Sequence, residues 1–450
     1  MGELKKTENW VAGLQWLFFI FANIVIIPVT VGKAFQLSDN AIMTTLQLSF
    51  IVTGCACVFQ ALWGHRRAIL EGQSGLWWGM ILTTVSIATA QGISLGELGG
   101  SLAVGILISA AITVVVGIFG WGTALAKLFK PGVMGVFMLL FGFQLIQIFL
   151  KGMLGIPMGN TPDNVSIVGS IAILSIIMML LMVVVNVTLP NKISKYSLLI
   201  GIVIGWAAFA IFLGEEKTVE SSSSFTFDFF LLGKPEFNIG IIIVAVVTGI
   251  LNLANTFGAL KGTEDLYESD TSKKQFSASL IISGIFTGIS GLLGLVPYAP
   301  FVSSIGFLKQ SGIIHRMPFI IGGVLFLMMG VFPPVAHFFS NIPLSVGSTV
   351  LFVSYLQLLM SSLDFLKKVK FNKRNVYRSA IPIFVAVVIM TFPESYFASI
   401  PTYIQPFIHN GLLVGITLAL VLENIIPWDK IQEKGDKNQN KSLITNNSVK

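Results

Sequence analysis

Gly72-Gln73-Ser74-Gly75 interrupts one long apolar stretch of the sequence, and Val302-Ser303-Ser304-Ile305-Gly306 interrupts another. Around these two breaks, 54% of the 450 residues are hydrophobic, 11% are charged, and the mean hydropathy is +0.83. This composition lies far outside the range of soluble globular domains. The sequence therefore predicts a polytopic membrane protein whose membrane segments are broken at two places.

The apolar stretches number about fourteen. A membrane-spanning helix needs about 20 residues, so fourteen would use about 280 of the 450 positions. Strands of a membrane barrel would instead alternate over segments of about ten residues. We expect an all-α protein with about 14 transmembrane segments. Fourteen segments divide into seven per half. Because seven is odd, the second half enters the membrane from the opposite side, and the two halves form an inverted repeat.

The two breaks fall in the third segment of each half, at 69–90 and 298–314. Glycine permits close backbone approach, and Pro300 cannot donate a backbone hydrogen bond. Short strands interrupting spans 3 and 10, each followed by a half-helix, are therefore expected. The half-helix N-termini would direct N–H groups at a substrate near the membrane midplane. The alternative is an ordinary kink where small residues ease helix contact.

The 28 lysines and arginines indicate the orientation, and the net charge is +7. With a cytoplasmic N-terminus, 24 of the 28 fall on the cytoplasmic side. We expect a multi-pass plasma-membrane protein with both termini in the cytoplasm. The basic run Lys367–Arg378 is typical of an anchor to the lipid bilayer and not of a nucleic-acid site. The polar tail 429–450 is expected to be cytoplasmic and disordered.

Motifs of enzymes and of cofactor sites are missing from the sequence. It has no glycine-rich phosphate loop with a following lysine, no metal-binding spacing of histidines or cysteines and no nucleophile motif. Cys55 and Cys57 lie two residues apart on one expected helix, so they face different directions and serve as small apolar fillers. We expect no enzyme activity, no cofactor and no metal.

Several motifs resemble the nucleobase and ascorbate transporters, also called nucleobase:cation symporter family 2, which includes bacterial uracil and xanthine permeases. Gly13-Leu14-Gln15 is similar to the opening Gly-Leu-Gln-His of that family, with Trp16 in place of the histidine. Ile69–Ser74 resembles its span 3 strand, Lys127–Gly135 the start of span 5, and Asn341–Gly347 the start of span 12. The likeness covers nearly the whole chain.

The resemblance implies a nucleobase site between spans 3, 8 and 10, where the family uses two carboxylates. In this sequence Asn255 stands at the first carboxylate, within Ala254–Ala259, and Ser303 stands at the second, within Phe301–Gly306. The substrate-binding residues expected on this basis are Ser74, Gly75, Asn255, Thr256, Val302, Ser303 and Ser304.

The replacement of acids by neutral groups changes the chemistry of the expected site. An ionised glutamate only accepts hydrogen bonds, whereas the Asn255 amide both donates and accepts. Structural roles stay open for the same residues: Ser303 and Ser304 could cap the half-helix, and Asn255 and Thr256 could join helices. The glutamines at positions 15, 60 and 73 are expected to support the core domain or to touch the ligand.

Glu71 is the one carboxylate expected beside the site, directly before the span 3 break. A charge at membrane depth costs about 2.5 to 3.5 kcal/mol on insertion scales, so such a residue is a functional candidate. We therefore expect Glu71 to carry a coupled proton. The alternative places it near the cytoplasmic interface, paired with Arg66 or Arg67.

The resemblance further implies a core domain and a gate domain that move against each other. The core would comprise 1–125 and 236–336, and the gate would comprise 126–235 and 337–428. We expect a secondary transporter that imports a purine or pyrimidine nucleobase such as xanthine or uracil, coupled to a proton or Na⁺. The alternatives are an anion transporter of the same fold and a membrane receptor or scaffold without transport. A homodimer through the gate domains stays open.

Overall fold

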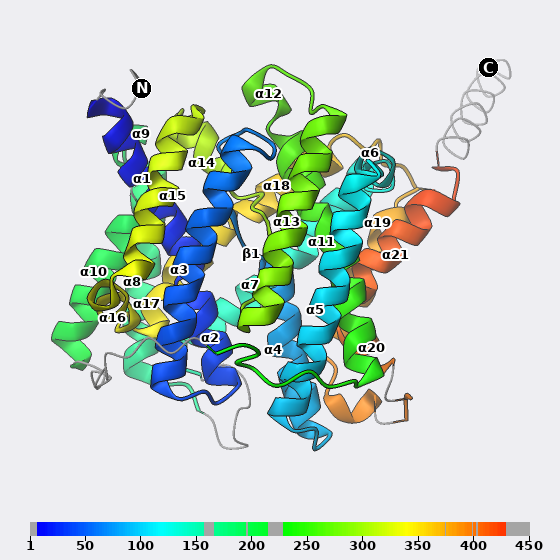
Figure 1. The fold of residues 1–450 in the computed structure, drawn as a ribbon, viewed down its shortest axis with the longest axis horizontal. Coiled ribbons are helices and arrows are strands. Elements are labelled where there is room, and N and C mark those ends of the chain that lie inside the picture. Colours follow the sequence, from blue (N-terminus) through cyan, green and yellow to red (C-terminus); the bar gives the residue numbers. More distant parts are fainter. Residues whose placement is uncertain are drawn as a thin grey trace, which may run out of the picture.

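The computed structural model describes residues 7–156, 166–194, 197–214, 228–373, 375–397, 399–401 and 404–428. In this part the chain is mostly helical and holds a single two-stranded sheet (Figure 1). The first residues of α1 and the end of α21 lie on the same, upper side of the view. The tail 429–450, expected to be disordered, lies outside the described residues.

The elements of the first half are α1 (Thr7–Ile24), α2 (Ile26–Ala34), α3 (Asp39–Leu62), β1 (Glu71–Gln73), α4 (Gly75–Ala90), α5 (Leu95–Ile118), α6 (Gly122–Ala126), α7 (Pro131–Met153), α8 (Gly169–Thr188), α9 (Asn191–Ser194) and α10 (Ser197–Leu213). Those of the second half are α11 (Ile239–Gly262), α12 (Glu264–Tyr267), α13 (Lys273–Leu293), β2 (Tyr298–Pro300), α14 (Ser304–Ser311), α15 (Arg316–Val331), α16 (Pro333–Ser340), α17 (Leu344–Tyr355), α18 (Gln357–Leu366), α19 (Tyr377–Ile389), the 3₁₀ helix η2 (Glu394–Phe397), α20 (Gln405–His409) and α21 (Gly411–Ile425).

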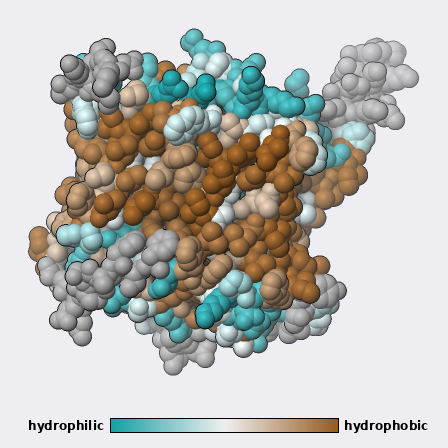
Figure 2. All heavy atoms as spheres, in the orientation of Figure 1, coloured by the Kyte–Doolittle hydropathy of each residue, from teal (hydrophilic) through white to brown (hydrophobic). Residues whose placement is uncertain are grey.

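The surface of the molecule matches a lipid environment. Figure 2 shows a broad belt of hydrophobic residues between two hydrophilic ends. Eight described helical segments are long and apolar enough to cross a membrane, and five more apolar helices have 10 to 17 residues. The chain is therefore a multi-pass membrane protein, as its composition predicts. The number of fourteen spans stays a prediction.

The helices associate in two groups. In the first group α5 packs against α11 and α13, and α15 packs against α1 and α3. In the second group α7 packs against α17, α18 and α21, while α8 contacts α10 and α17, and α19 contacts α21. Each group joins helices from both halves of the sequence. The packing thus brings distant segments of the chain side by side.

Polar residues fix several helix ends. Ser38, Ser94 and Asn238 accept hydrogen bonds from the first-turn backbone of α3, α5 and α11. Such caps satisfy backbone N–H groups that have no partner within the helix. At the other end of α13, Gly294 has φ of 69°, in the left-handed region that glycine adopts without strain. This turn ends α13 and directs the chain into β2.

A glycine allows α3 and α15 to approach closely. A Cβ atom on Gly54 would lie 2.7 Å from the backbone nitrogen of Leu327 on α15. Small residues at crossings of this kind let helix backbones come into contact in apolar surroundings. The contact holds the first group of helices together beside β1.

Two short strands lie at the breaks seen in the sequence. β1 and β2 pair antiparallel, with Glu71 opposite Pro300 and Gly72 opposite Ala299. The Ser74 N–H donates to the Pro297 carbonyl at 2.7 Å and continues the pairing. β1 lies near the centre of the bundle (Figure 1). Backbone groups at this depth need protein partners because lipid offers none, and the two strands supply them to each other.

Candidate functional site

A strand and a helix follow each other at both breaks. α4 begins at Gly75 directly after β1, and α14 begins at Ser304 shortly after β2. The first N–H groups of a helix have no acceptor within it and carry the positive end of the helix dipole. Because the strands pair, both helix starts are held at one place in the middle of the fold. The start of α4 offers backbone donors here, whereas at the start of α14 the Ser304 and Ile305 N–H groups already donate to the Phe301 and Val302 carbonyls.

A narrow cavity lies at this place, between the two groups of helices. Its walls on one side are Ser74, Gly75, Asn255 and the segment 299–303. On the other side lie Phe141 of α7, Tyr355 of α17 and Leu358 of α18. The cavity holds about 20 Å³, which is room for about one water molecule. A ligand larger than water therefore requires the two groups of helices to separate.

Five of the seven residues expected to bind substrate line this cavity: Ser74, Gly75, Asn255, Val302 and Ser303. The Ser303 hydroxyl is buried and has no hydrogen-bond partner among the described residues. Ser303 occupies the N-cap position of α14 without a capping hydrogen bond from its side chain. Its hydroxyl is thus available to a ligand.

The other two residues expected to bind substrate take different positions. The Ser304 hydroxyl accepts a hydrogen bond from the Leu70 N–H at 3.0 Å, which ties α14 to the segment before β1. Thr256 lines a second cavity, together with Asn252 and Leu253 of the same helix. Neither residue lines the cavity beside Asn255, and their contact with a substrate stays a prediction. Neighbouring residues on a helix differ in direction by about 100°, and of Asn255 and Thr256 it is Asn255 that lines this cavity.

Hydrogen bonds connect Asn255 to the strand side of the cavity through Asn252. Asn255 Nδ2 donates to Asn252 Oδ1 at 2.9 Å, and Ser74 Oγ donates to the same oxygen at 2.6 Å. Asn252 Nδ2 in turn donates to the Tyr298 carbonyl at 3.1 Å. A weaker contact of 3.4 Å joins Asn255 Nδ2 to Ser74 Oγ. Asn255 therefore lines the cavity and also contacts Asn252 on its own helix and Ser74 directly before α4.

Glu71 is fully buried on β1, and its carboxylate has two hydrogen-bond donors. Ser283 Oγ donates to Oε1 at 2.7 Å, and Gln60 Nε2 donates to Oε2 at 3.1 Å. The two salt bridges among the described residues do not include Glu71. The alternative expectation, that Glu71 pairs with Arg66 or Arg67, is therefore wrong.

Arg67 is instead bound to the C-terminal end of α11. Its Nη1 donates to the Leu260 carbonyl at 2.6 Å and to Thr263 Oγ1 at 3.0 Å. A cation at the end of a helix is favoured by the helix dipole. His65 lies two residues before Arg67. Burial, and to a smaller extent the neighbouring Arg67 charge, lower the pKa of His65 to about 3. His65 is therefore neutral at ordinary pH.

The three glutamines expected to support the core differ in their contacts. Gln60 is fully buried, and besides Glu71 its Nε2 reaches the Ser279 carbonyl and Ser283 Oγ, both at 3.1 Å. Gln73 Nε2 donates to Ser49 Oγ on α3 at 2.9 Å. Gln15 is half-buried on α1. Gln60 and Gln73 thus join β1 to α3 and α13, and neither lines the cavity beside Asn255.

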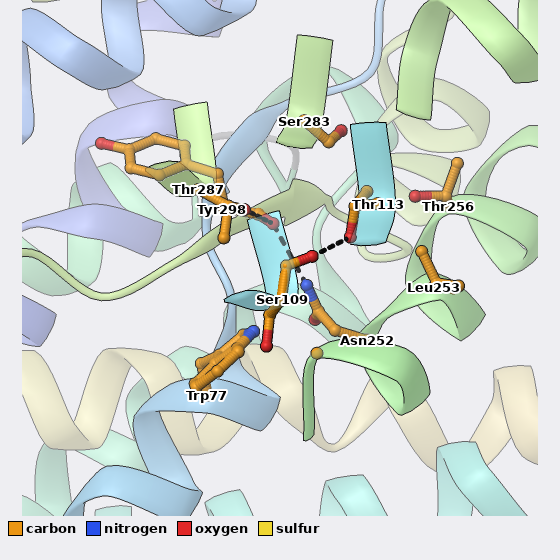
Figure 3. A pocket seen from close by; sticks show the side chains of 10 residues that line it. Trp77, Ser109, Thr113, Asn252, Leu253, Thr256, Ser283, Thr287 and Tyr298 are labelled. Carbon is orange, nitrogen blue, oxygen red and sulfur yellow. Dashed lines mark hydrogen bonds between the residues drawn. The ribbon is translucent and has the colours of Figure 1, made fainter. Parts of the chain in front are cut away.

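The second cavity lies between α4, α5, α11, α13 and β2, and Figure 3 shows its lining. It has about 10 Å³ of space, about the size of one water molecule. Hydroxyl and amide groups surround it, from Ser109, Thr113, Asn252, Thr256, Ser283 and Thr287. Trp77 also lines it, and its buried Nε1 has no hydrogen-bond partner among the described residues. The lining therefore suits one buried water.

Its spacing in the sequence marks Asn252 as a companion of Asn255. It precedes Asn255 by three residues, so both lie on one face of α11. Phe141, Tyr355 and Leu358, on the other side of the cavity, had no such signal, because aromatic and aliphatic residues are common throughout the apolar segments. Their part in the cavity depends on how the two groups of helices pack.

No cluster of three or more potential metal ligands occurs among the histidines, cysteines and acids of the described residues. Cys55 and Cys57 are free thiols on α3. The polar groups of the two cavities are neutral amides, hydroxyls and backbone groups.

A family model described as "Permease family", Xan_ur_permease, matches residues 7–395 of the chain. The chain belongs to this family. Its resemblance to the nucleobase and ascorbate transporters is thereby confirmed, and the family consists of permeases and not of enzymes.

Curated relatives match more than nine-tenths of the chain. A putative purine permease, YwdJ of Bacillus subtilis, is 29% identical over 92% of this chain and 95% of its own. A xanthine permease of Bacillus subtilis is 23% identical over 96% of this chain and 98% of its own. Among solved structures, the transmembrane domain of the cyanobacterial bicarbonate transporter BicA has a TM-score of 0.61 at 16% identity. It covers 92% of this chain and 97% of its own. That likeness concerns the fold.

Proposed function

We propose that this permease is a secondary active transporter that imports a purine or pyrimidine nucleobase across the plasma membrane. The observation that supports it best is the cavity in which Ser74, Asn255 and Ser303 face Phe141 and Tyr355. Binding sites for small organic molecules combine a mostly apolar wall with a few convergent polar groups. The printed names of the relatives, which include purine and xanthine permeases, agree with this substrate class.

The lining suits both surfaces of a nucleobase. A planar base presents aromatic faces, and Phe141, Phe301 and Tyr355 supply rings for stacking or edge contacts. Its edge presents ring N–H and carbonyl groups in alternation. The Asn255 amide, the Ser303 hydroxyl and the backbone N–H groups at the start of α4 are the proposed partners of that edge.

Transport requires the cavity to open to each side of the membrane in turn. We infer that the first group of helices is the core domain, 1–125 and 236–336, and that the second is the gate domain, 126–235 and 337–428. The cavity lies between them and is closed by Phe141, Tyr355 and Leu358 of the gate. In this proposal fourteen spans form a 7+7 inverted repeat, and both termini lie in the cytoplasm. Homodimers would form through the gate domains.

Glu71 is the proposed carrier of a coupled proton. It is buried without a cationic partner among the described salt bridges, and Ser283 connects it to the water-sized cavity. Asn252 lines the same cavity and bonds to Asn255 and Ser74. A polar path thus runs from Glu71 to the substrate cavity, and Na⁺ is the alternative coupling ion.

The deciding experiment is uptake by the purified protein in proteoliposomes. Labelled uracil, xanthine, hypoxanthine, guanine and adenine would be offered with and without an imposed proton gradient. We expect accumulation of at least one base, driven by the gradient. Uptake of bicarbonate, chloride or sulfate without uptake of any base would instead support an anion transporter. Base binding without uptake would support a receptor.

A further inference from the structure

Asn252 lies behind the substrate cavity and bonds to three groups around it. Its side chain is 8% exposed, on the face of α11 that also carries Asn255. Figure 3 shows the Asn252 amide directed at Tyr298. It does not line the substrate cavity itself, so direct contact with a ligand there does not explain its contacts.

The direction of the Asn252 amide follows from its backbone partner. A carbonyl oxygen only accepts hydrogen bonds, so the Asn252 atom 3.1 Å from the Tyr298 carbonyl must be the nitrogen, Nδ2. The oxygen Oδ1 must then face Ser74 and Asn255. Because Asn252 Oδ1 can only accept hydrogen bonds, the Asn255 atom 2.9 Å from it must be the nitrogen Nδ2.

The Asn255 carbonyl oxygen is consequently the free end of this amide. It has no hydrogen-bond partner among the described residues, and Asn255 lines the substrate cavity. Reversing the Asn255 amide would bring two carbonyl oxygens to within hydrogen-bond distance of each other. That arrangement loses a hydrogen bond and adds repulsion between two buried acceptors.

We propose that Asn252 is a positioning residue that fixes the Asn255 amide with its carbonyl oxygen toward the ligand. The cavity then selects neutral ligands with a ring N–H at this point. The inference deepens the proposed function and rests on it. The donors beside Asn255 are the Ser303 hydroxyl and the start of α4, which match a carbonyl next to that N–H. The substrate class is thus a base with a lactam edge.

The fixed amide also bears on the choice between a base and an anion. A carbonyl oxygen directed into the cavity repels a negative ligand, whereas a freely turning amide could present its N–H₂ group instead. The site can therefore use the N-terminus of α4 and still reject small inorganic anions. The expected ligand is therefore a neutral base, in contrast to the ligand of an anion transporter with a similar fold.

Two pairs of bases test the inference, because each pair keeps the ring system and reverses the edge. Hypoxanthine has N1–H beside a carbonyl, and adenine has an unprotonated N1 beside an amino group. Uracil and cytosine differ in the same way at N3. We expect the wild-type protein to bind hypoxanthine over adenine, and uracil over cytosine, by tenfold or more. Binding would be measured as ligand-induced thermal stabilisation and as competition against a labelled base.

Two substitutions at one position separate orientation from packing. Asn252→Leu keeps the size of the side chain and removes the oxygen that holds Asn255, so the preference within each pair should fall below threefold. Asn252→Asp, measured at pH 5.5, keeps that oxygen, and as a neutral buried acid it also donates to the Tyr298 carbonyl. It should preserve the wild-type preference.

Each remaining outcome has a definite meaning. An unchanged preference in Asn252→Leu overturns the inference while the proposed function stands. Loss of the preference in Asn252→Asp, in a protein that melts as the wild type does, also overturns it. If the wild-type protein binds no base at all, xanthine and guanine included, the proposed function and the inference both fail. If it binds xanthine or guanine but none of the four, only the inference fails. Competition by bicarbonate or sulfate at the same site would contradict the rejection of anions.

Discussion

The carboxylate of Glu71 accepts a 2.7 Å hydrogen bond from the hydroxyl of Ser283, a residue 212 positions later in the chain. Gln60 binds the other carboxylate oxygen, so the acid is held by two neutral donors. This pairing joins β1 to α13 inside the first group of helices. It also places the one buried acid of this group next to a water-sized polar cavity.

Replacing Glu71 by glutamine should uncouple transport. The glutamine amide fits among the same hydrogen-bonding groups but carries no exchangeable acidic proton. Exchange of a labelled base across proteoliposome membranes should persist, while accumulation under a proton gradient should fall to a ratio of about one. Accumulation equal to that of the wild type would mean that Glu71 does not carry the coupled proton. Dependence on a Na⁺ gradient would identify the alternative ion.

Asn255→Ala should weaken base binding. It removes the polar group that we propose as the partner of the base edge, a loss of about 1–3 kcal/mol or about 5- to 150-fold in affinity. The matched control is Asn186→Ala on the exposed side of α8, away from both cavities. Affinity measured by competition should change only in the first variant. Equal affinities in both would mean that the substrate lies elsewhere.

Gly75→Ala should obstruct the cavity. A Cβ atom on Gly75 would lie 2.8 Å from Phe141 Cζ and 3.2 Å from Leu145 Cδ1, so these side chains of α7 must shift. Overpacking of this kind costs about 1–3 kcal/mol, and base affinity should fall by tenfold or more. Gly96→Ala is the control, because it also lies in the first turn of a helix but has open space around it. Wild-type binding in Gly75→Ala would contradict the closed contact between α4 and α7.

A buried ion pair stabilises the second group of helices. Arg378 Nε donates to Glu423 Oε2 at 2.7 Å, and its Nη2 contacts Oε1, with both side chains almost inaccessible. Removing one partner leaves a buried charge, so Arg378→Ala or Glu423→Ala should lower the free energy of unfolding by about 3–5 kcal/mol. Thermal unfolding in detergent measures the effect.

The double variant Arg378→Met with Glu423→Leu tests the cause of that loss. It removes both charges and keeps apolar volume, so it should be more stable than either single alanine variant. A loss equal to the sum of the two single losses would mean that the residues act independently. The pair itself was not expected, because Glu423 and the basic run Lys367–Arg378 belong to different segments of the sequence.

Part of the site could be predicted because its signals are local. Glycine, proline and hydroxyl residues mark Gly72–Gly75 and Val302–Gly306 as breaks, since they act on the backbone where they stand. Both strands lie at or beside these breaks. Five of the seven expected binding residues then share one cavity. The two exceptions, Thr256 and Ser304, are direct neighbours of residues that do line it.

The sequence by itself determined the membrane class, the positions of the two breaks and the neutral groups at Asn255 and Ser303. Hydropathy and backbone chemistry belong to each segment, so no knowledge of neighbours is needed. Tertiary structure alone decided which side chains line the cavity and which hold them in place. Asn252 takes its direction from Tyr298 and Glu71 its partners from α3 and α13, because hydrogen bonds between distant segments exist only once the helices have packed.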